Sequence, residues 1–161
     1  MLFTPTRAYN TILSVTPEVL AEMGVDAIIL DIDNTCTTHD NPVPIDGLFE
    51  WLDSMRAAGI KMMIVSNNHP PRVEPFAELL GLEYVSEGAK PLPKGYKEAA
   101  KRMGADRNRI VTIGDQLFTD ILGAKLFGIK SILVKPIEHE KTVFFKIKRA
   151  LEIPLLPKKY L

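Results

Sequence analysis

The sequence predicts an α/β fold of three layers, with helices on both faces of a doubly wound parallel sheet of about five strands. Short β-branched apolar runs alternate along the chain with longer segments of helical periodicity. Ten or more residues separate successive strands, as the crossover between parallel strands requires. A length of 161 residues, 46% of them hydrophobic and 25% charged, fits one globular domain over residues 1–161.

A short helix over residues 16–24 is predicted to precede the first strand. Thr16 is suited to cap this helix, Pro17 to occupy its first position and Gly24 to end it. The run DAIILDID, residues 26–33, follows. It predicts a strand buried on both faces, because it is short, continuous and rich in β-branched residues.

Residues 45–59 predict a helix that ends at Gly59. Apolar residues recur on one side of this helix at the spacing that buries a single face. They are Ile45, Leu48, Phe49, Leu52 and Met55. Trp51 lies off this face and is interpreted as a packing residue.

The rest of the chain repeats the alternation, which is typical of a Rossmann-like arrangement. Further strands are predicted at residues 61–66, 82–86, 109–114 and 130–135. Helices ending at glycines are predicted at residues 71–81, 94–104 and 118–128. A last helix, residues 140–152, carries an apolar stripe of Val143, Phe144, Ile147 and Leu151. The core should therefore span about residues 25–135, followed by a basic amphipathic helix and tail over about 138–161.

Charge and cysteine content restrict the function classes. The formal net charge is zero, which gives no reason to expect a nucleic-acid partner. Residues 135–161 hold seven Lys or Arg and three Glu, so a net charge of +4 is concentrated there, and we expect it on a solvated helix face or at an anionic membrane surface. Cys36 is the only cysteine, which indicates a reducing compartment and a small buried filler.

No segment has the pattern of a membrane span or of a secretory signal. We therefore expect a cytoplasmic protein, with peripheral contact at the inner face of the membrane as the role of the basic tail.

Polar residues follow the predicted strands where each one ends. In parallel α/β sheets, ligands bind beyond the carboxyl ends of the strands, so these side chains should gather at one edge. They are Asp31 and Asp33, Ser66 and Asn67, Lys90 in the loop after the third strand, and Asp115 with Asp120 beyond it.

Converging carboxylates repel one another and lose solvation unless a cation lies among them. Mg²⁺ suits such a site, because it prefers hard oxygen ligands, whereas the absence of His and Cys ligands at these positions argues against zinc. With a cation present, a carboxylate can attack phosphorus and form an aspartyl phosphate. Lys90, the Ser66 hydroxyl and the Asn67 N–H could neutralise the phosphoryl oxygens, and a second acid, Asp33, could transfer protons.

The ordered motifs DIDNT, SNN, AKP and GDQLFTD resemble those of the haloacid dehalogenase (HAD) superfamily of phosphohydrolases. The resemblance covers roughly residues 25–135. It implies a Mg²⁺-dependent phosphomonoester hydrolase in which Asp31 is the nucleophile and Asp33 the general acid/base. The implied binding residues are Ser66 and Lys90 for phosphate, where the strand-end argument adds Asn67. For Mg²⁺ they are Asp31, the Asp33 carbonyl and Asp115, with Thr35 and Asp120 as supporting residues.

Two features of the motifs leave alternatives open. Lys94 could replace Lys90 as the motif lysine, although the KP dipeptide that opens the loop favours Lys90. The segments that could hold a cap domain are too short for one, so we expect a site closed only by a small flap around residues 36–44. His39 and His69 lie near this rim and are interpreted as solvated loop residues, with contact with the substrate as the alternative.

Within the superfamily, the segments TPEVLAEMG, SNN, GAKP and GDQLFTD are similar to subclass IIIA and to its branch of phosphatidylglycerophosphate phosphatases. Cys36 and Ala89 depart from that pattern, where leucine and lysine are common. The resemblance implies a lipid-linked phosphate as substrate, with a small phosphorylated metabolite or nucleotide as the alternative. A phospho-accepting signalling module is a rival class, but such modules lack a second acid at the position of Asp33. A fold retained only for protein binding is the third possibility.

Overall fold

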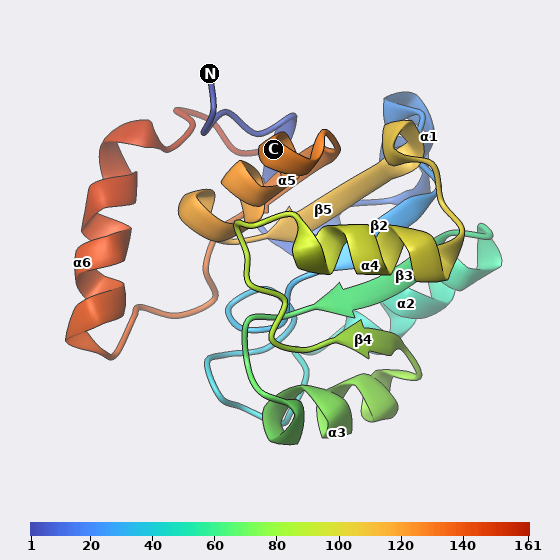
Figure 1. Ribbon diagram of the computed structural model, residues 1–161, viewed down its shortest axis with the longest axis horizontal. Helices are drawn as coiled ribbons and strands as arrows, with labels where there is room; N and C mark the ends of the chain where they lie inside the picture. Colours follow the sequence, from blue (N-terminus) through green and yellow to red (C-terminus); the bar gives the residue numbers. More distant parts are fainter.

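The computed structural model describes residues 1–161 and contains a fully parallel six-stranded sheet with helices on both faces (Figure 1). The strand order is β1-β6-β5-β2-β3-β4, so the chain winds outward in both directions from β2. The strands are β1 (Arg7–Tyr9), β2 (Ala27–Leu30), β3 (Lys61–Val65), β4 (Glu83–Val85), β5 (Ile110–Gly114) and β6 (Lys130–Val134). The α/β fold class predicted from the sequence is confirmed.

The predicted number of strands was one too low, because the edge strand β1 was missed. This strand has three residues and begins with Arg7, so it lacks the continuous apolar run that marked the other strands. It pairs with β6, where Arg7 lies opposite Ile132 and Tyr9 opposite Val134. A strand this short is defined by its partner and carries little periodicity of its own.

Five helices cover the two faces of the sheet. The first face carries α1 (Pro17–Met23), α2 (Leu48–Ala57) and α3 (Pro70–Leu80), and the second carries α4 (Lys94–Met103) and α5 (Leu122–Phe127). Strand β2 serves both layers, because Ile28 and Leu30 pack with the first group while Ala27 and Ile29 pack with the second. Its four residues are all buried, as a central strand between two helical layers requires.

The buried face of α2 differs from the predicted one. The helix begins at Leu48, and its buried residues are Leu48, Trp51, Leu52 and Met55. Phe49, expected in the core, is 45% exposed, whereas Trp51 is buried and donates its indole N–H to the carbonyl of Val15 at 2.7 Å. Trp51 is a packing residue, as interpreted, but it belongs to the main face.

The last helix, α6 (Val143–Glu152), stands at the side of the molecule, away from the helices that cover the sheet (Figure 1). Its apolar stripe faces solvent: Val143, Phe144, Ile147 and Leu151 are 58–73% exposed. Its opposite side carries Arg149 and the buried Glu152. No helix of the chain combines the length and apolar character needed to cross a bilayer.

The register of the central strands brings their carboxyl ends to one edge. Leu30, the last residue of β2, lies opposite Ile64 of β3 and Ile113 of β5. The residues that follow each strand therefore emerge side by side. This edge carries the polar side chains that the sequence analysis selected.

Candidate active site

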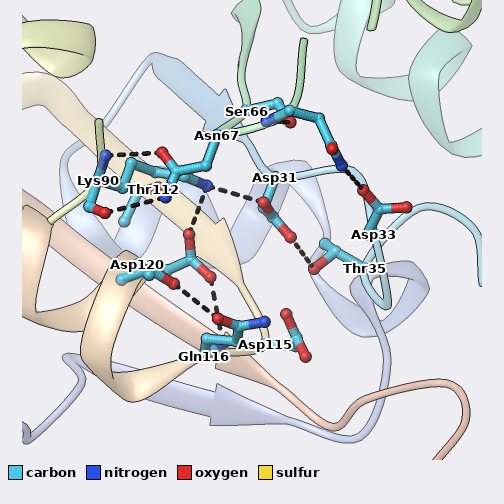
Figure 2. A network of polar contacts seen from close by, with 12 residues as sticks. Asp31, Asp33, Thr35, Ser66, Asn67, Lys90, Thr112, Asp115, Gln116 and Asp120 are labelled. Carbon is cyan, nitrogen blue, oxygen red and sulfur yellow. Dashed lines mark hydrogen bonds and ion pairs between the residues drawn. The ribbon is translucent and has the colours of Figure 1, made fainter. Parts of the chain in front are cut away.

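Asp31 follows β2 directly and is tied to the sheet by its N–H, which donates to the carbonyl of Ile113 at 3.0 Å. Both of its carboxylate oxygens are engaged (Figure 2). Oδ1 accepts from Nζ of Lys90 at 2.7 Å, and Oδ2 accepts from the Thr35 hydroxyl at 3.1 Å. Burial raises the pKa of Asp31 to about 6, although the charge of Lys90 opposes the rise.

Lys90 is buried, and its ammonium group lies 2.7 Å from Oδ1 of Asp120 as well as 2.7 Å from Asp31. Burial lowers the pKa of this ammonium group, but the two carboxylates outweigh burial and raise the pKa well above its usual value. The Asn67 side chain fixes the Lys90 backbone: Lys90 N–H donates to Oδ1 at 2.7 Å, and Nδ2 donates to the Lys90 carbonyl at 2.9 Å. Lys94, the other candidate, is exposed at the start of α4.

Asp31, Asp115 and Asp120 form an acidic cluster, in which each residue offers an oxygen within 4.8 Å of the others. Asp120 was expected only as a supporting residue, yet it belongs to this cluster. It lies on a π-helical turn, Leu117–Ile121, a geometry that often occurs at functional sites. Gly114 makes room for it, because a Cβ atom at Gly114 would lie 2.3 Å from Cγ of Asp120.

The Asp33 carboxylate points away from that cluster and has partners of its own. Its Oδ1 accepts from Nη2 of Arg72 at 2.9 Å and from the Asp40 N–H at 2.9 Å, and its Oδ2 accepts from Nδ2 of Asn68 at 2.8 Å. The chain turns sharply after it at Asn34, whose φ of 59° is one that Asn tolerates better than most residues. The chain thus leaves the strand direction just after Asp31, and the two acids reach different parts of the cavity.

Ser66 follows β3 and lines the same cavity as Asp31 and Asp33. Its Oγ accepts from the Asn68 N–H at 3.1 Å and keeps its own proton free to donate. The N–H of Asn67 donates to no group of the chain. A hydroxyl, a free N–H and the Lys90 ammonium group are therefore available to one anionic ligand.

The acidic cluster fits a hard divalent cation. All its ligand atoms are carboxylate oxygens, and Asp115 is almost fully buried. Oδ1 of Asp115 is buried and has no hydrogen-bond partner, which is costly for a carboxylate oxygen unless a ligand occupies the site. Burial raises the pKa of Asp115 well above its usual value, while the charge of Arg149 opposes the rise.

A cavity of about 770 Å³ opens beside Asp31 and Asp33, and its walls correct the expectation of a site closed only by a small flap. Helix α6 contributes Phe144, Phe145 and Lys148 to the lining. His39 lines the cavity from the predicted flap and packs edge to face against Phe145, with ring centroids 5.1 Å apart. His69 is exposed and pairs with Glu87 at 2.7 Å.

Two arginines of the site were missed by the sequence analysis. Arg72 binds Asp33, and Arg149 binds Asp115 through both the carboxylate and the main-chain carbonyl. Each arginine is more than thirty residues from its partner in the chain, so no local spacing could reveal either pair. The only weak signal was that Arg72 lies in the first turn of α3, shortly after the SNN motif, whereas Arg149 is far from every motif in the chain.

Comparison with known proteins agrees with this geometry. The family model of haloacid dehalogenase-like hydrolases matches residues 11–128, more than half of the chain. The chain belongs to the haloacid dehalogenase-like hydrolases. It is 38% identical over 154 residues to a Bacillus subtilis protein named probable phosphatase YqeG, covering 96% of this chain and 90% of that one. The family match and this relative together identify the chain as a HAD-type phosphatase.

Other relatives share less of their length with this HAD-type chain. A glyceraldehyde 3-phosphate phosphatase of Pyrococcus abyssi is 30% identical over 122 residues, which cover 69% of this chain and 50% of that protein. A solved structure of 4-nitrophenylphosphatase from Thermotoga maritima has a TM-score of 0.61 at 14% identity, covering 76% of this chain and 90% of that one. At this identity, the likeness shows the fold alone.

Proposed function

We propose that the chain is a Mg²⁺-dependent phosphomonoesterase that works through an aspartyl phosphate on Asp31. A carboxylate oxygen of Asp31 forms a bond to phosphorus while the ester P–O bond breaks, and water then cleaves the acyl phosphate. The observation that carries this proposal is the position of Asp31, which lines the cavity and lies 2.7 Å from the Lys90 ammonium group.

Phosphate binding is assigned to Ser66, Asn67 and Lys90. Ser66 and Asn67 line the same cavity as Asp31, and the Ser66 hydroxyl and the free Asn67 N–H can both donate to phosphoryl oxygens. Lys90 supplies a positive charge, and the amide of Asn67 fixes its backbone. Asn67 therefore has two roles in this proposal, one through its N–H and one through its side chain.

Proton transfer is assigned to Asp33. In the first step Asp33 gives a proton to the leaving oxygen, and in the second it takes one from the attacking water. Arg72 and Asn68 hold its carboxylate at the cavity wall, which supports a fixed position for this group. A receiver-type signalling module would have no use for an acid held in this way.

The cation is assigned to the carboxylates of Asp31 and Asp115 and the main-chain carbonyl of Asp33, with Asp120 as a close neighbour. When bound, Mg²⁺ would neutralise charge that develops on the phosphoryl oxygens. Thr35, which donates to Oδ2 of Asp31, would keep the nucleophile oriented. Asp120 would hold Lys90 in place through the 2.7 Å ion pair.

For the substrate we propose a lipid-linked phosphate of the phosphatidylglycerophosphate kind, in line with the IIIA-type motifs. The cavity of about 770 Å³ is open enough for a headgroup that remains attached to a bilayer. Phe144 belongs both to the cavity lining and to the exposed apolar stripe of α6, so the mouth of the site continues into an apolar surface. A small phosphorylated metabolite or nucleotide is the alternative substrate.

The distribution of charged side chains around α6 supports contact with an anionic membrane. Of the three glutamates in residues 135–161, Glu140 and Glu152 are buried against Arg149, and Glu138 pairs with Lys141 at 3.3 Å. The unpaired exposed charges are therefore positive: Lys135, Lys146, Lys158 and Lys159. Exposed apolar side chains next to lysines are the pattern of interfacial helices.

Phosphate release across a substrate panel tests this proposal. The panel holds phosphatidylglycerophosphate in vesicles, sugar phosphates, nucleotides and p-nitrophenyl phosphate, each with Mg²⁺ and with the Asp31→Asn variant as control. We expect release that needs Asp31 and is fastest with the lipid. If the wild type releases phosphate from every ester no faster than the Asp31→Asn variant does, the phosphatase mechanism is refuted. A preference of the wild type for a soluble ester would refute only the lipid assignment.

A further inference from the structure

Arg149 joins helix α6 to the acidic cluster through four contacts. Its Nη2 binds Oδ2 of Asp115, and its Nη1 donates to the Asp115 main-chain carbonyl at 2.7 Å. The same guanidinium group donates to Glu140 at 3.0 Å and to Glu152 at 2.9 Å. Burial lowers the pKa of Arg149, but the charge of Asp115 and the other carboxylates outweighs burial and raises the pKa.

The two oxygens of Asp115 have different surroundings. Oδ2 is held by Arg149, whereas Oδ1 is buried without a hydrogen-bond partner. Asp115 also offers an oxygen within 4.8 Å of Asp31 and Asp120. A carboxylate fixed on one side and unsatisfied on the other is the arrangement expected of a metal ligand oriented by a neighbouring residue.

We propose that Arg149 is a positioning residue for the cation site, and that it couples closure of α6 over the cavity to cation binding. Arg149 fixes the Asp115 carboxylate so that Oδ1 stays available to the cation. Since Arg149 belongs to α6, the same contacts hold Phe145 and Lys148 against the cavity. The inference rests on the proposed function, because it needs a divalent cation at this site.

The opposite role, in which Arg149 competes with the cation, is disfavoured by its partners. A free guanidinium group next to Asp115 would repel a divalent cation. Glu140 and Glu152 are both buried and both bind Arg149, so two further carboxylates neutralise its charge. The local charge of these four groups stays negative, which favours a cation beside Asp115.

Calorimetric titration of the metal-free protein with Mg²⁺ and Mn²⁺ tests the positioning role. We expect Arg149→Gln to raise the dissociation constant for the cation about 10- to 100-fold. Arg149→Lys should recover only part of the lost affinity, because lysine lacks the planar fork of donors that arginine has. The matched control is Arg102→Gln, which removes an arginine that binds Glu83 and the Tyr84 carbonyl far from the site. Thermal melting establishes that each variant is folded.

The inference would be overturned if a folded Arg149→Gln variant bound the cation as tightly as the wild type. Tighter binding by the variant would also overturn it, because it would mean that Arg149 competes with the cation for Asp115. Wild-type protein that binds neither metal would overturn the cation assignment of the proposed function as well. These results separate the two failures, because the wild-type titration is read independently of the variants.

Hydrogen exchange of the wild-type chain tests the coupling without any substitution. Thermodynamic linkage is reciprocal. If the position of α6 over the cavity strengthens cation binding, then cation binding must stabilise α6 in that position. We therefore expect Mg²⁺ to slow amide exchange in residues 143–152, while exchange in α2 changes little. Equal exchange of residues 143–152 with and without Mg²⁺, at a concentration that saturates the site, would contradict the coupling even if the Arg149 variants fail to fold.

Discussion

The Nζ atom of Lys90 lies 2.7 Å from Oδ1 of Asp31, and both groups are largely withdrawn from solvent. The same Nζ atom lies 2.7 Å from Oδ1 of Asp120, so one ammonium group is shared by Asp31, which follows β2, and Asp120, on the π-helical turn after β5. Buried charges of this kind are tolerable only while each has a partner. The stability of the metal-free site and its chemistry should therefore both depend on Lys90.

We expect Lys90→Met to lower the turnover number about 10²- to 10³-fold, because an important charge facing the phosphoryl oxygens is lost. The variant should also lose about 3–5 kcal/mol of free energy of unfolding, since Asp31 and Asp120 remain buried without their partner. Initial rates on p-nitrophenyl phosphate and urea unfolding measure the two effects. Lys94→Met, a change at an exposed residue, is the control, and the reverse result would make Lys94 the motif lysine.

The pKa of Asp31 gives a stability prediction for the metal-free protein. Its folded-state pKa of about 6 lies above the ordinary value of 3.8, so the folded chain keeps a proton that the unfolded chain releases between these pH values. Stability should therefore fall as pH rises from about 4 to 6, and the penalty should persist above pH 6. Asp31→Asn removes the penalty.

We accordingly expect the stability of Asp31→Asn relative to the wild type to increase between pH 4 and pH 7.5 by on the order of 2–3 kcal/mol. Urea unfolding in EDTA at several pH values measures this gain, and phosphate release should be lost at every pH. A gain that does not change with pH would mean that Asp31 is not forced toward its neutral form by burial.

The positions of these acids were predictable from the sequence because they depend on strand ends. Apolar runs marked β2, β3 and β5, and parallel pairing brings their carboxyl ends to one edge. The exact partners of each acid were not predictable in the same way. Arg72 and Arg149 reach Asp33 and Asp115 only because of how α3 and α6 are oriented, and long-range packing sets those orientations.

The errors in the fold have similar causes. Strand β1 is too short to show periodicity, and its partner β6 lies more than a hundred residues later in the chain. The face of α2 was misplaced because Ile45 was counted as part of the helix, whereas the helix begins at Leu48. Trp51 is buried and Phe49 is exposed. The role of α6 as a cavity wall was not predicted, because its charges and apolar stripe indicated a solvated face or a membrane contact. In the structure, Phe144, Phe145 and Lys148 of this helix line the cavity.

Asp33→Asn should slow the second step more than the first when the leaving group needs no proton. With p-nitrophenyl phosphate we expect a burst of nitrophenol followed by slow turnover, reduced about 10²- to 10⁴-fold, because the amide cannot activate water. Stopped-flow absorbance measures the burst and the steady rate. Asp53→Asn, at an exposed position of α2, serves as control, and unchanged turnover in Asp33→Asn would assign the proton transfer to another group.

The apolar stripe of α6 should set the affinity for anionic vesicles. We expect the triple change Val143→Ser, Ile147→Ser and Leu151→Ser to reduce vesicle binding at least tenfold, and salt to weaken the remaining binding. Co-sedimentation with vesicles containing phosphatidylglycerol measures it. Leu79→Ser and Leu126→Ser, at positions 51% exposed on α3 and α5, serve as controls.

Equal vesicle binding by the triple variant and the wild type would refute the membrane contact. Point changes are preferable to removal of residues 138–161, because that removal would also delete Arg149 and the wall of the cavity. Activity on soluble p-nitrophenyl phosphate should be retained by the triple variant, since none of its three residues lines the cavity.

The nucleophile is the central claim, and trapping the phosphorylated enzyme tests it most directly. Asp33→Asn protein is mixed with p-nitrophenyl phosphate and Mg²⁺, quenched in acid within the burst, digested, and mapped by mass spectrometry. We predict phosphate on the peptide that contains Asp31, at Asp31 itself, and none when EDTA is present. Nitrophenol release with no phosphate on Asp31, or with phosphate on another residue, would contradict the account.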